Sequence, residues 1–153
     1  NRVLVQEVQL YNELLSVAAS SLRRLISCME GVERLDEGSD RLAKEIYHNM
    51  LPKEWSRVLM PTNKTLSSYM LTLTEATNFF SKWVRAGIPS AFWLPAFFFP
   101  QAVASAVTVN FCRHEKVGIE TVTLEHIVLK AAVPHVVRVP IADGAYVIGL
   151  SVA

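Results

Sequence analysis

The sequence predicts an α+β fold, with about four helices in residues 1–115 followed by an incomplete antiparallel β-sheet or barrel in residues 116–153. Three observations support this prediction. Apolar residues recur at helical spacing early in the chain, prolines interrupt an uncharged stretch in the middle, and β-branched residues gather after Gly118. Because the helices precede the strands, the order favours α+β over an alternating α/β fold.

Residues 3–29 show the clearest helical pattern. Apolar residues recur there in steps of three and four, which places them on one continuous face of a helix. They are Leu4, Val8, Tyr11, Leu15, Ala18, Leu22, Leu25 and Met29. Gly31 is a suitable stop. We interpret this segment as a core helix of a bundle. The alternative is an unrelated interaction module that dimerises through the same helix.

A second helix is expected to start at Ser39 or Asp40, because both residue types cap helix N-termini, and to run to residue 49. Pro52 is expected to end it, since proline cannot continue a helix. The loop that follows is expected to be pinned by Trp55.

A third helix is predicted over residues 65–85, where Gly87 and then Pro89 follow in the order typical of a helix end. Aromatic residues dominate its last turns, and we interpret them as core packing. The face consists of Leu66, Tyr69, Met70, Leu73, Ala76, Phe80, Trp83 and Val84.

No charged residue occurs in residues 86–112, and a stretch of this length could cross a membrane. However, Pro89, Pro95 and Pro100 prevent one continuous helix through its first half. We therefore expect a buried, extended aromatic run over residues 92–99, and then a helix with Pro100 near its first turn. A membrane-associated protein that uses residues 86–112 is the alternative.

Strand signals begin after Gly118. Residues 121–129 and 136–139 are rich in β-branched side chains, and Asp143-Gly144 is a strong turn signal. A last strand is expected from Tyr146 to the end of the chain. Three short strands make an incomplete sheet, whose edge would need a partner.

Composition narrows the possible functions. The chain is 51% apolar and 19% charged, with a net charge of +1, so a basic nucleic-acid-binding surface is not expected. Its only cysteines, Cys28 and Cys112, indicate free thiols in a reducing compartment. Both ends of the sequence look cut, so we expect a piece of a longer protein.

Signals of catalysis are missing from the sequence. It has neither GxxxxGK[ST] nor GxGxxG, the glycine-rich patterns that cradle phosphates. No two of its four histidines stand at the i, i+4 spacing of a helical zinc site. We therefore expect no catalytic, cofactor-binding or metal-binding residue, and no enzymatic activity in this chain.

Residues 92–101 read FWLPAFFFPQ, which resembles the block FW-(I/L)-S-G-F-F-F-(T/P)-Q in the C-terminal region of the dynein heavy chain, in its axonemal form. Other blocks resemble that family in the same order: a QE…YNELL…SL helix, LPKEW, FFSKW with GIP, and P..DG.YV.GL. The resemblance covers nearly the whole sequence. One departure is Pro95-Ala96, where the family has Ser-Gly.

The resemblance implies that residues 1–153 are a fragment of the C-terminal domain of a dynein heavy chain, which lies across the ring of AAA+ modules. Expected partners are those modules and other dynein subunits; microtubules, ATP and Mg would bind elsewhere in the parent motor, in the axoneme of a cilium or flagellum. No membrane partner is expected. The candidate ring-packing or structural residues are Trp55, Phe80, Trp83, Phe92, Trp93, Phe97, Phe98, Phe99 and Tyr146.

Overall fold

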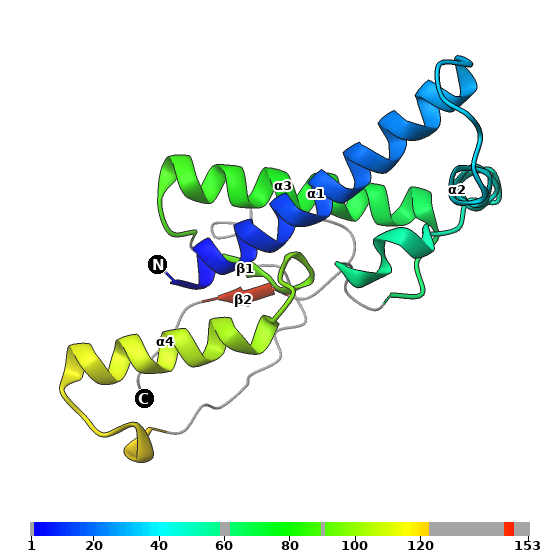
Figure 1. Cartoon of the computed structure of the whole chain (residues 1–153). Coiled ribbons are helices and arrows are strands. Elements are labelled where there is room, and N and C mark those ends of the chain that lie inside the picture. The colour runs from blue at the N-terminus through cyan, green and yellow to red at the C-terminus, as the bar shows by residue number, and fades with distance from the viewer. Residues whose placement is uncertain (1, 59–61, 90, 123–145, 149–153) are drawn as a thin grey trace.

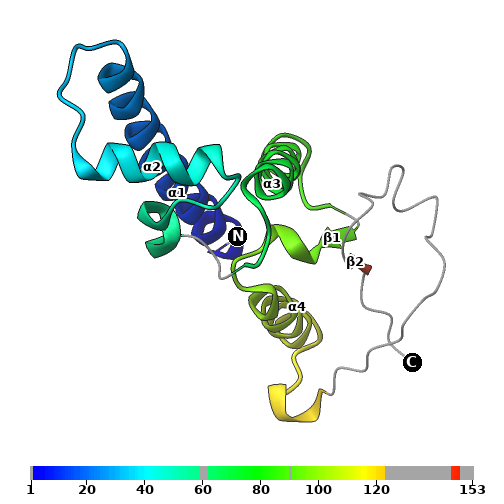
Figure 2. The same ribbon diagram turned by 90° about the vertical axis from the view of Figure 1, so that its right-hand side faces the viewer.

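The computed structural model describes residues 2–58, 62–89, 91–122 and 146–148. These residues form the helices α1 (Arg2–Met29), α2 (Glu37–Tyr47), α3 (Leu66–Ala86) and α4 (Pro100–Glu115), the 3-10 helices η1 (Lys53–Arg57), η2 (Leu94–Ala96) and η3 (Ile119–Thr121), and the strands β1 (Ala91–Trp93) and β2 (Tyr146–Ile148). In both views the short strand β1 lies between α3 and α4 (Figures 1 and 2), and Figure 1 shows α1 crossing α3.

The first and third helices are confirmed. α1 continues to Met29, and Gly31 follows with a positive φ of 74°, a conformation that glycine adopts easily. At the start of α3 the Thr65 hydroxyl accepts a hydrogen bond from Ser68 N. Gly87 caps its C-terminus, as its position in the sequence predicts.

The predicted bounds of the second helix are wrong at both ends. α2 begins at Glu37 because Asp36 caps it, with its carboxylate accepting a hydrogen bond from Ser39 N at 2.8 Å. Ser39 therefore lies within the first turn and is fully buried. The helix ends at Tyr47, before Pro52 is reached, because the chain turns at Asn49 with a φ of 55°.

Asn49, two residues after the end of α2, contacts the N-terminus of α3. Its carbonyl accepts a hydrogen bond from Leu66 N at 3.0 Å, and its side-chain oxygen accepts one from Ser67 N at 2.8 Å. These two N–H groups belong to the first turn of α3 and have no acceptor within that helix. Asn49 thus completes the N-terminus of α3, and this contact explains why α2 stops where it does.

The fourth helix is confirmed, with Pro100 in its first turn. Val103 is buried, whereas Ala102, Ala106, Val107 and Val109 of the same helix are half-buried. None of the helices among the described residues combines the length and apolar character that a crossing of a lipid bilayer requires.

The predicted β part is not supported. Within the described residues, only β1 and β2 are strands, and they pair antiparallel over three residues each, with Trp93 opposite Tyr146. β1 comes from the aromatic run and not from the C-terminal part. Thr121, expected at the start of a strand, lies in η3. The predicted strands over 122–129 and 136–139 and the turn at Asp143-Gly144 lie essentially outside the described residues.

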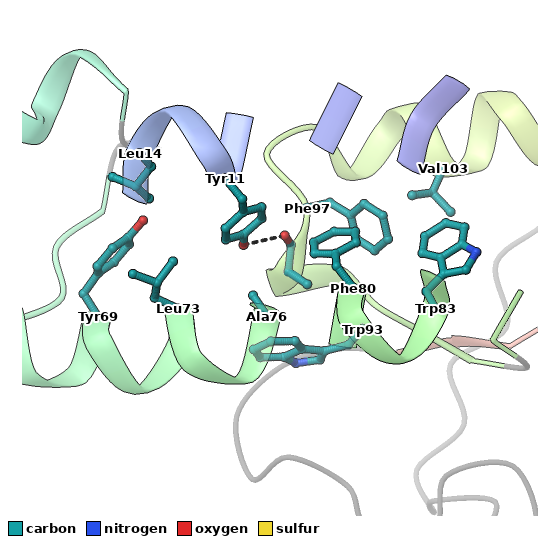
Figure 3. Close-up of a cluster of buried hydrophobic side chains, with 11 residues drawn as sticks. Tyr11, Leu14, Tyr69, Leu73, Ala76, Phe80, Trp83, Trp93, Phe97 and Val103 are labelled. Carbon is teal, nitrogen blue, oxygen red and sulfur yellow. Dashed lines mark hydrogen bonds between the residues drawn. The ribbon is translucent and has the colours of Figure 1, made fainter. Parts of the chain in front are cut away.

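The main core forms where α1, α3, η2 and α4 meet (Figure 3). Aromatic side chains make up much of it, and Leu14, Ala76, Ala96 and Phe97 are fully buried. At about 25 cal/mol per Å² of buried apolar surface, aromatic rings are its largest contributors. The aromatic run of the sequence is thus part of this core.

Candidate functional site

The aromatic segment, residues 92–99, follows a bent path from β1 to the start of α4. Trp93 leads directly into η2, where Phe97 N donates a hydrogen bond to Leu94 O at 3.1 Å. Pro95 lies within this turn, and Pro100 opens α4 immediately after Phe99. The prolines therefore set the bends of the segment, as the sequence predicts.

Two residues of α1 hold the aromatic segment by hydrogen bonds. The Tyr11 hydroxyl donates to Ala96 O at 2.7 Å (Figure 3). One helical turn earlier, the Glu7 carboxylate accepts from the backbone N–H groups of Phe98, at 2.8 Å, and Phe99, at 3.2 Å. Residues four apart lie on the same face of a helix, so one face of α1 makes all three contacts.

These anchoring groups are buried. Glu7 is 1% exposed, and burial raises the pKa of its carboxyl, while the hydrogen bonds from Phe98 and Phe99 act in the opposite direction. The pKa of Tyr11 is also raised, first by burial and then by the nearby Tyr69 and Glu7. Tyr11 therefore keeps its proton and remains a hydrogen-bond donor at neutral pH.

Ring contacts fix the side chains of the segment against α1 and α3. Phe97 meets Phe80 edge to face with ring centroids 5.4 Å apart, and Phe98 meets Tyr11 in the same way at 5.1 Å. Phe92 meets Trp83 at 5.3 Å. Aromatic pairs of this kind contribute roughly 0.5–1.5 kcal/mol each beyond their buried area.

Eight of the nine predicted ring-packing residues fall into two groups by their exposure. Five of them are buried within the chain itself: Trp55, Phe80, Trp83, Trp93 and Phe97. The outer group differs, since Phe92 and Phe98 are half-buried and Phe99 is 45% exposed. Tyr146 lies in β2, paired with Trp93 through the backbone. The buried residues serve the chain's own core, and contact with another module stays a prediction.

A shallow apolar groove of about 460 Å³ lies beside the aromatic segment. Its walls come from α4, from Ile88 after α3, from Phe92 and from the first turn of α1 at Val3. Ile88 is 74% exposed. The indole N–H of Trp83, another wall residue, has no hydrogen-bond partner among the described residues. We call this feature the α4 groove.

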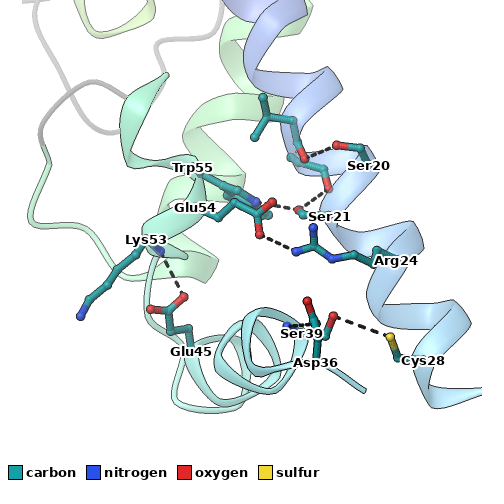
Figure 4. Close-up of polar contacts among 12 residues, drawn as sticks. Ser20, Ser21, Arg24, Cys28, Asp36, Ser39, Glu45, Lys53, Glu54 and Trp55 are labelled. Atoms are coloured by element: carbon teal, nitrogen blue, oxygen red, sulfur yellow. Dashed lines mark hydrogen bonds and ion pairs between the residues drawn. The ribbon is translucent and has the colours of Figure 1, made fainter. Parts of the chain in front are cut away.

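A second, polar anchor joins α1 to η1 (Figure 4). The Trp55 indole N–H donates to Ser21 Oγ at 2.9 Å, and Ser21 in turn donates to Ala18 O at 2.9 Å. Trp55 is 2% exposed, so the prediction that it pins its loop is confirmed. The Arg24–Glu54 ion pair, at 2.8 Å, lies nearby but is partly exposed, and such pairs stabilise by at most about 1 kcal/mol.

Sequence reasoning missed Glu7 and Ser21, the two polar residues of the buried face of α1. The predicted stripe included Leu15 and Met29, which are 40% and 77% exposed. Tyr11 and Leu25 of the predicted stripe are buried, together with Leu14 and the two polar residues. A glutamate one turn before Tyr11, on an otherwise apolar face, is the signal that could have revealed a buried acceptor.

Nothing in the part of the chain that the structure describes groups three His, Cys, Asp or Glu side chains in a way that could hold a metal. The described geometry is one of anchoring and packing. The groups that make these contacts are aromatic rings, the Glu7 carboxylate and the hydroxyls of Tyr11 and Ser21.

Comparison with known proteins identifies this arrangement. The family model described as the C-terminal domain of the dynein heavy chain matches residues 1–153. The chain belongs to this family of dynein C-terminal domains. The resemblance seen in the sequence is therefore confirmed over the full length.

Several curated relatives of this dynein domain are axonemal. The chain is 35% identical over 150 residues to dynein axonemal heavy chain 1 of Rattus norvegicus, and 35% identical to that of Homo sapiens. It is 30% identical over 151 residues to dynein axonemal heavy chain 8 of Mus musculus. Each alignment covers 98% of this chain but only 3–4% of the relative, so the chain spans a small part of their length.

Proposed function

We propose that this chain is a non-catalytic C-terminal module of an axonemal dynein heavy chain. It packs on the ring of AAA+ modules of the same heavy chain and supports ATP-driven, minus-end-directed movement along microtubules. Support comes from the family match over residues 1–153 and from relatives named as axonemal heavy chains. ATP, Mg and microtubules would bind to other parts of that motor, located in the cytoskeleton of a cilium or flagellum.

The docking proposal rests on apolar side chains that remain exposed outside the chain's own core. Ile88 is 74% exposed and lines the α4 groove, and Phe99, at the end of the aromatic segment just before α4, is 45% exposed. Exposed apolar surface that is continuous with a groove is typical of an interface. The rest of a dynein heavy chain is the partner that the relatives' length makes available.

The chain would act by contact with neighbouring modules of the motor. A rigid module bound across several neighbours restricts their relative motion, and movement between motor modules is part of a stepping cycle. We therefore expect the chain to stiffen the ring and to tune stepping, with the aromatic segment and the α4 groove as the contact surface.

The test compares ATPase and gliding motility of the parent motor with and without residues 1–153. A change in velocity, or in the coupling of ATP turnover to movement, is expected. A second motor carries Ile88→Ser and Phe99→Ser, which leave the buried core intact, and a control carries Tyr47→Ser, since Tyr47 is 85% exposed in another part of the chain. Motors that all behave like the parent would end the proposal.

A further inference from the structure

The start of α4 lacks the groups that usually complete a helix N-terminus. Phe99 occupies the N-cap position and provides no side-chain cap, and the first turn contains no acidic residue. The first N–H groups of a helix have no acceptor within it, and the partial positive charge at this end favours a nearby anion. In α4, a 16-residue helix, no side chain of the first turn provides such an anion.

Glu7 supplies it from α1. Its two carboxylate oxygens accept hydrogen bonds from Phe99 N and Phe98 N, the N–H groups of the cap residue and of the residue before it. The carboxylate is 1% exposed, and among the described residues no Lys, Arg or His forms an ion pair with it. A buried carboxylate without a cation needs another source of stabilisation, and the end of α4 provides one.

We infer that Glu7 is a positioning residue that caps α4 from another helix and thereby fixes the place where α4 starts relative to α1. This contact spans 91 residues of sequence. Phe99, at the junction, then keeps its exposed position at the start of α4. The consequence for docking rests on the proposed function, whereas the capping of α4 by Glu7 does not.

The contact is also a mechanical connection between two helices. α1 is a single helix of 28 residues, and its other anchor, Ser21 with Trp55, lies four turns further along. A displacement of α1 would therefore be transmitted through Glu7 to the first turn of α4. The two helices move together as long as the carboxylate keeps both hydrogen bonds.

Hydrogen–deuterium exchange, read by mass spectrometry on the full-length polypeptide that includes residues 1–153, tests the inference. Glu7→Gln keeps the size of the side chain but removes the charge and one of the two acceptor oxygens. Exchange over residues 98–107, read from overlapping peptides that begin upstream of Phe98, should rise about tenfold, because one of the two N–H groups then faces an amide NH2 group and loses its acceptor. Exchange across α3 should stay unchanged, and Glu13→Gln, on the exposed side of α1, serves as the control.

A rescue variant separates capping from simple core packing. Gln101 is exposed in the first turn of α4, so Gln101→Glu places a new anion at the same helix end. In the Glu7→Gln background it should lower the exchange of residues 98–107 by a few-fold. In the parent background Gln101→Glu should not lower this exchange, because the new carboxylate and that of Glu7 repel each other. Ser105→Glu, exposed one turn later, should give no rescue.

The inference is overturned if Glu7→Gln leaves residues 98–107 unchanged, if exchange rises equally in α3, or if Gln101→Glu fails to restore protection. None of these readings depends on the motor ring. The two proposals can fail separately. If the exchange data verify capping but Phe99→Ser leaves motility unchanged, the role of Glu7 stands and the proposed docking is contradicted.

Discussion

The hydroxyl of Tyr11 lies 2.7 Å from the carbonyl oxygen of Ala96, 85 residues further along the chain, and donates a hydrogen bond to it. Both residues are buried. This contact holds η2 against α1, together with the hydrogen bonds of Glu7 to Phe98 and Phe99. It explains why a run of apolar residues interrupted by prolines has a defined place in the core.

Tyr11→Phe should destabilise the protein by about 1–3 kcal/mol, because it leaves the buried carbonyl of Ala96 without its donor. Urea unfolding followed by circular dichroism measures the change. The matched control is Tyr47→Phe, since Tyr47 is 85% exposed and should tolerate the loss of its hydroxyl. Equal midpoints for the two variants would show that the Tyr11 contact contributes nothing.

Ser21→Ala should also destabilise the protein by roughly 1–3 kcal/mol, because the indole N–H of Trp55 would remain buried without an acceptor. The neighbouring Ser20 provides the control. Its hydroxyl bonds to Val17 O at an exposed position, so Ser20→Ala should change the unfolding free energy little. If Ser21→Ala and Ser20→Ala change the unfolding free energy equally, Trp55 is held by packing alone.

Asp36 caps the N-terminus of α2, and its substitution should therefore affect this helix. Asp36→Ala should reduce the helicity and lower the unfolding midpoint, whereas Asp36→Asn should preserve both, since asparagine is an equally good cap. The hydrogen bonds from the side chain and backbone of Ser39 lower the pKa of Asp36. This cap should therefore weaken only at a pH below the usual aspartate range. A larger loss from Asp40→Ala would contradict the assignment.

Glu7 should make the stability of the protein depend on pH in an unusual direction. Its pKa is raised in the folded state, first by burial, so the folded protein binds this proton more tightly than the unfolded protein. Stability should consequently fall as pH rises from about 4.5 through the folded pKa of Glu7, and then level off.

Urea unfolding across pH 4.5–7.5 measures this dependence, with Glu7→Gln as the comparison. The difference between parent and variant isolates the contribution of Glu7 from other carboxyl groups. The cap at Asp36 does not interfere, because its lowered pKa places its effect below this window. If the unfolding free energy of the parent rises with pH relative to that of Glu7→Gln, the folded state does not raise the pKa of Glu7.

The spacing of apolar residues, and residues that start or end helices, allowed much of the helical part to be predicted. The stripe from Leu4 to Leu25, Thr65 before α3 and Pro100 at α4 are local signals, so the sequence alone reveals them. The start of α2 was wrong because several cap-competent residues compete within a few positions, and only the backbone conformation of Asp36 decides among them.

The candidate site was predictable only in part. The aromatic segment stands out in the sequence, but which of its rings face inward depends on packing between helices far apart in the sequence. The acceptor role of Glu7 depends on N–H groups 91 and 92 residues away, and no periodicity encodes such a contact. Phe97 and Phe99, two residues apart, differ from fully buried to 45% exposed for the same reason.

Site-specific photo-crosslinking tests the central claim, docking on the motor ring, most directly. p-Benzoylphenylalanine replaces Phe99 in the full-length motor, and a second motor carries it at Tyr47, in another part of the domain. Irradiation followed by peptide mass spectrometry should link position 99 to AAA+ modules of the same heavy chain, at a yield well above that of position 47. Absence of such links, or equal yields from both positions, would contradict the account.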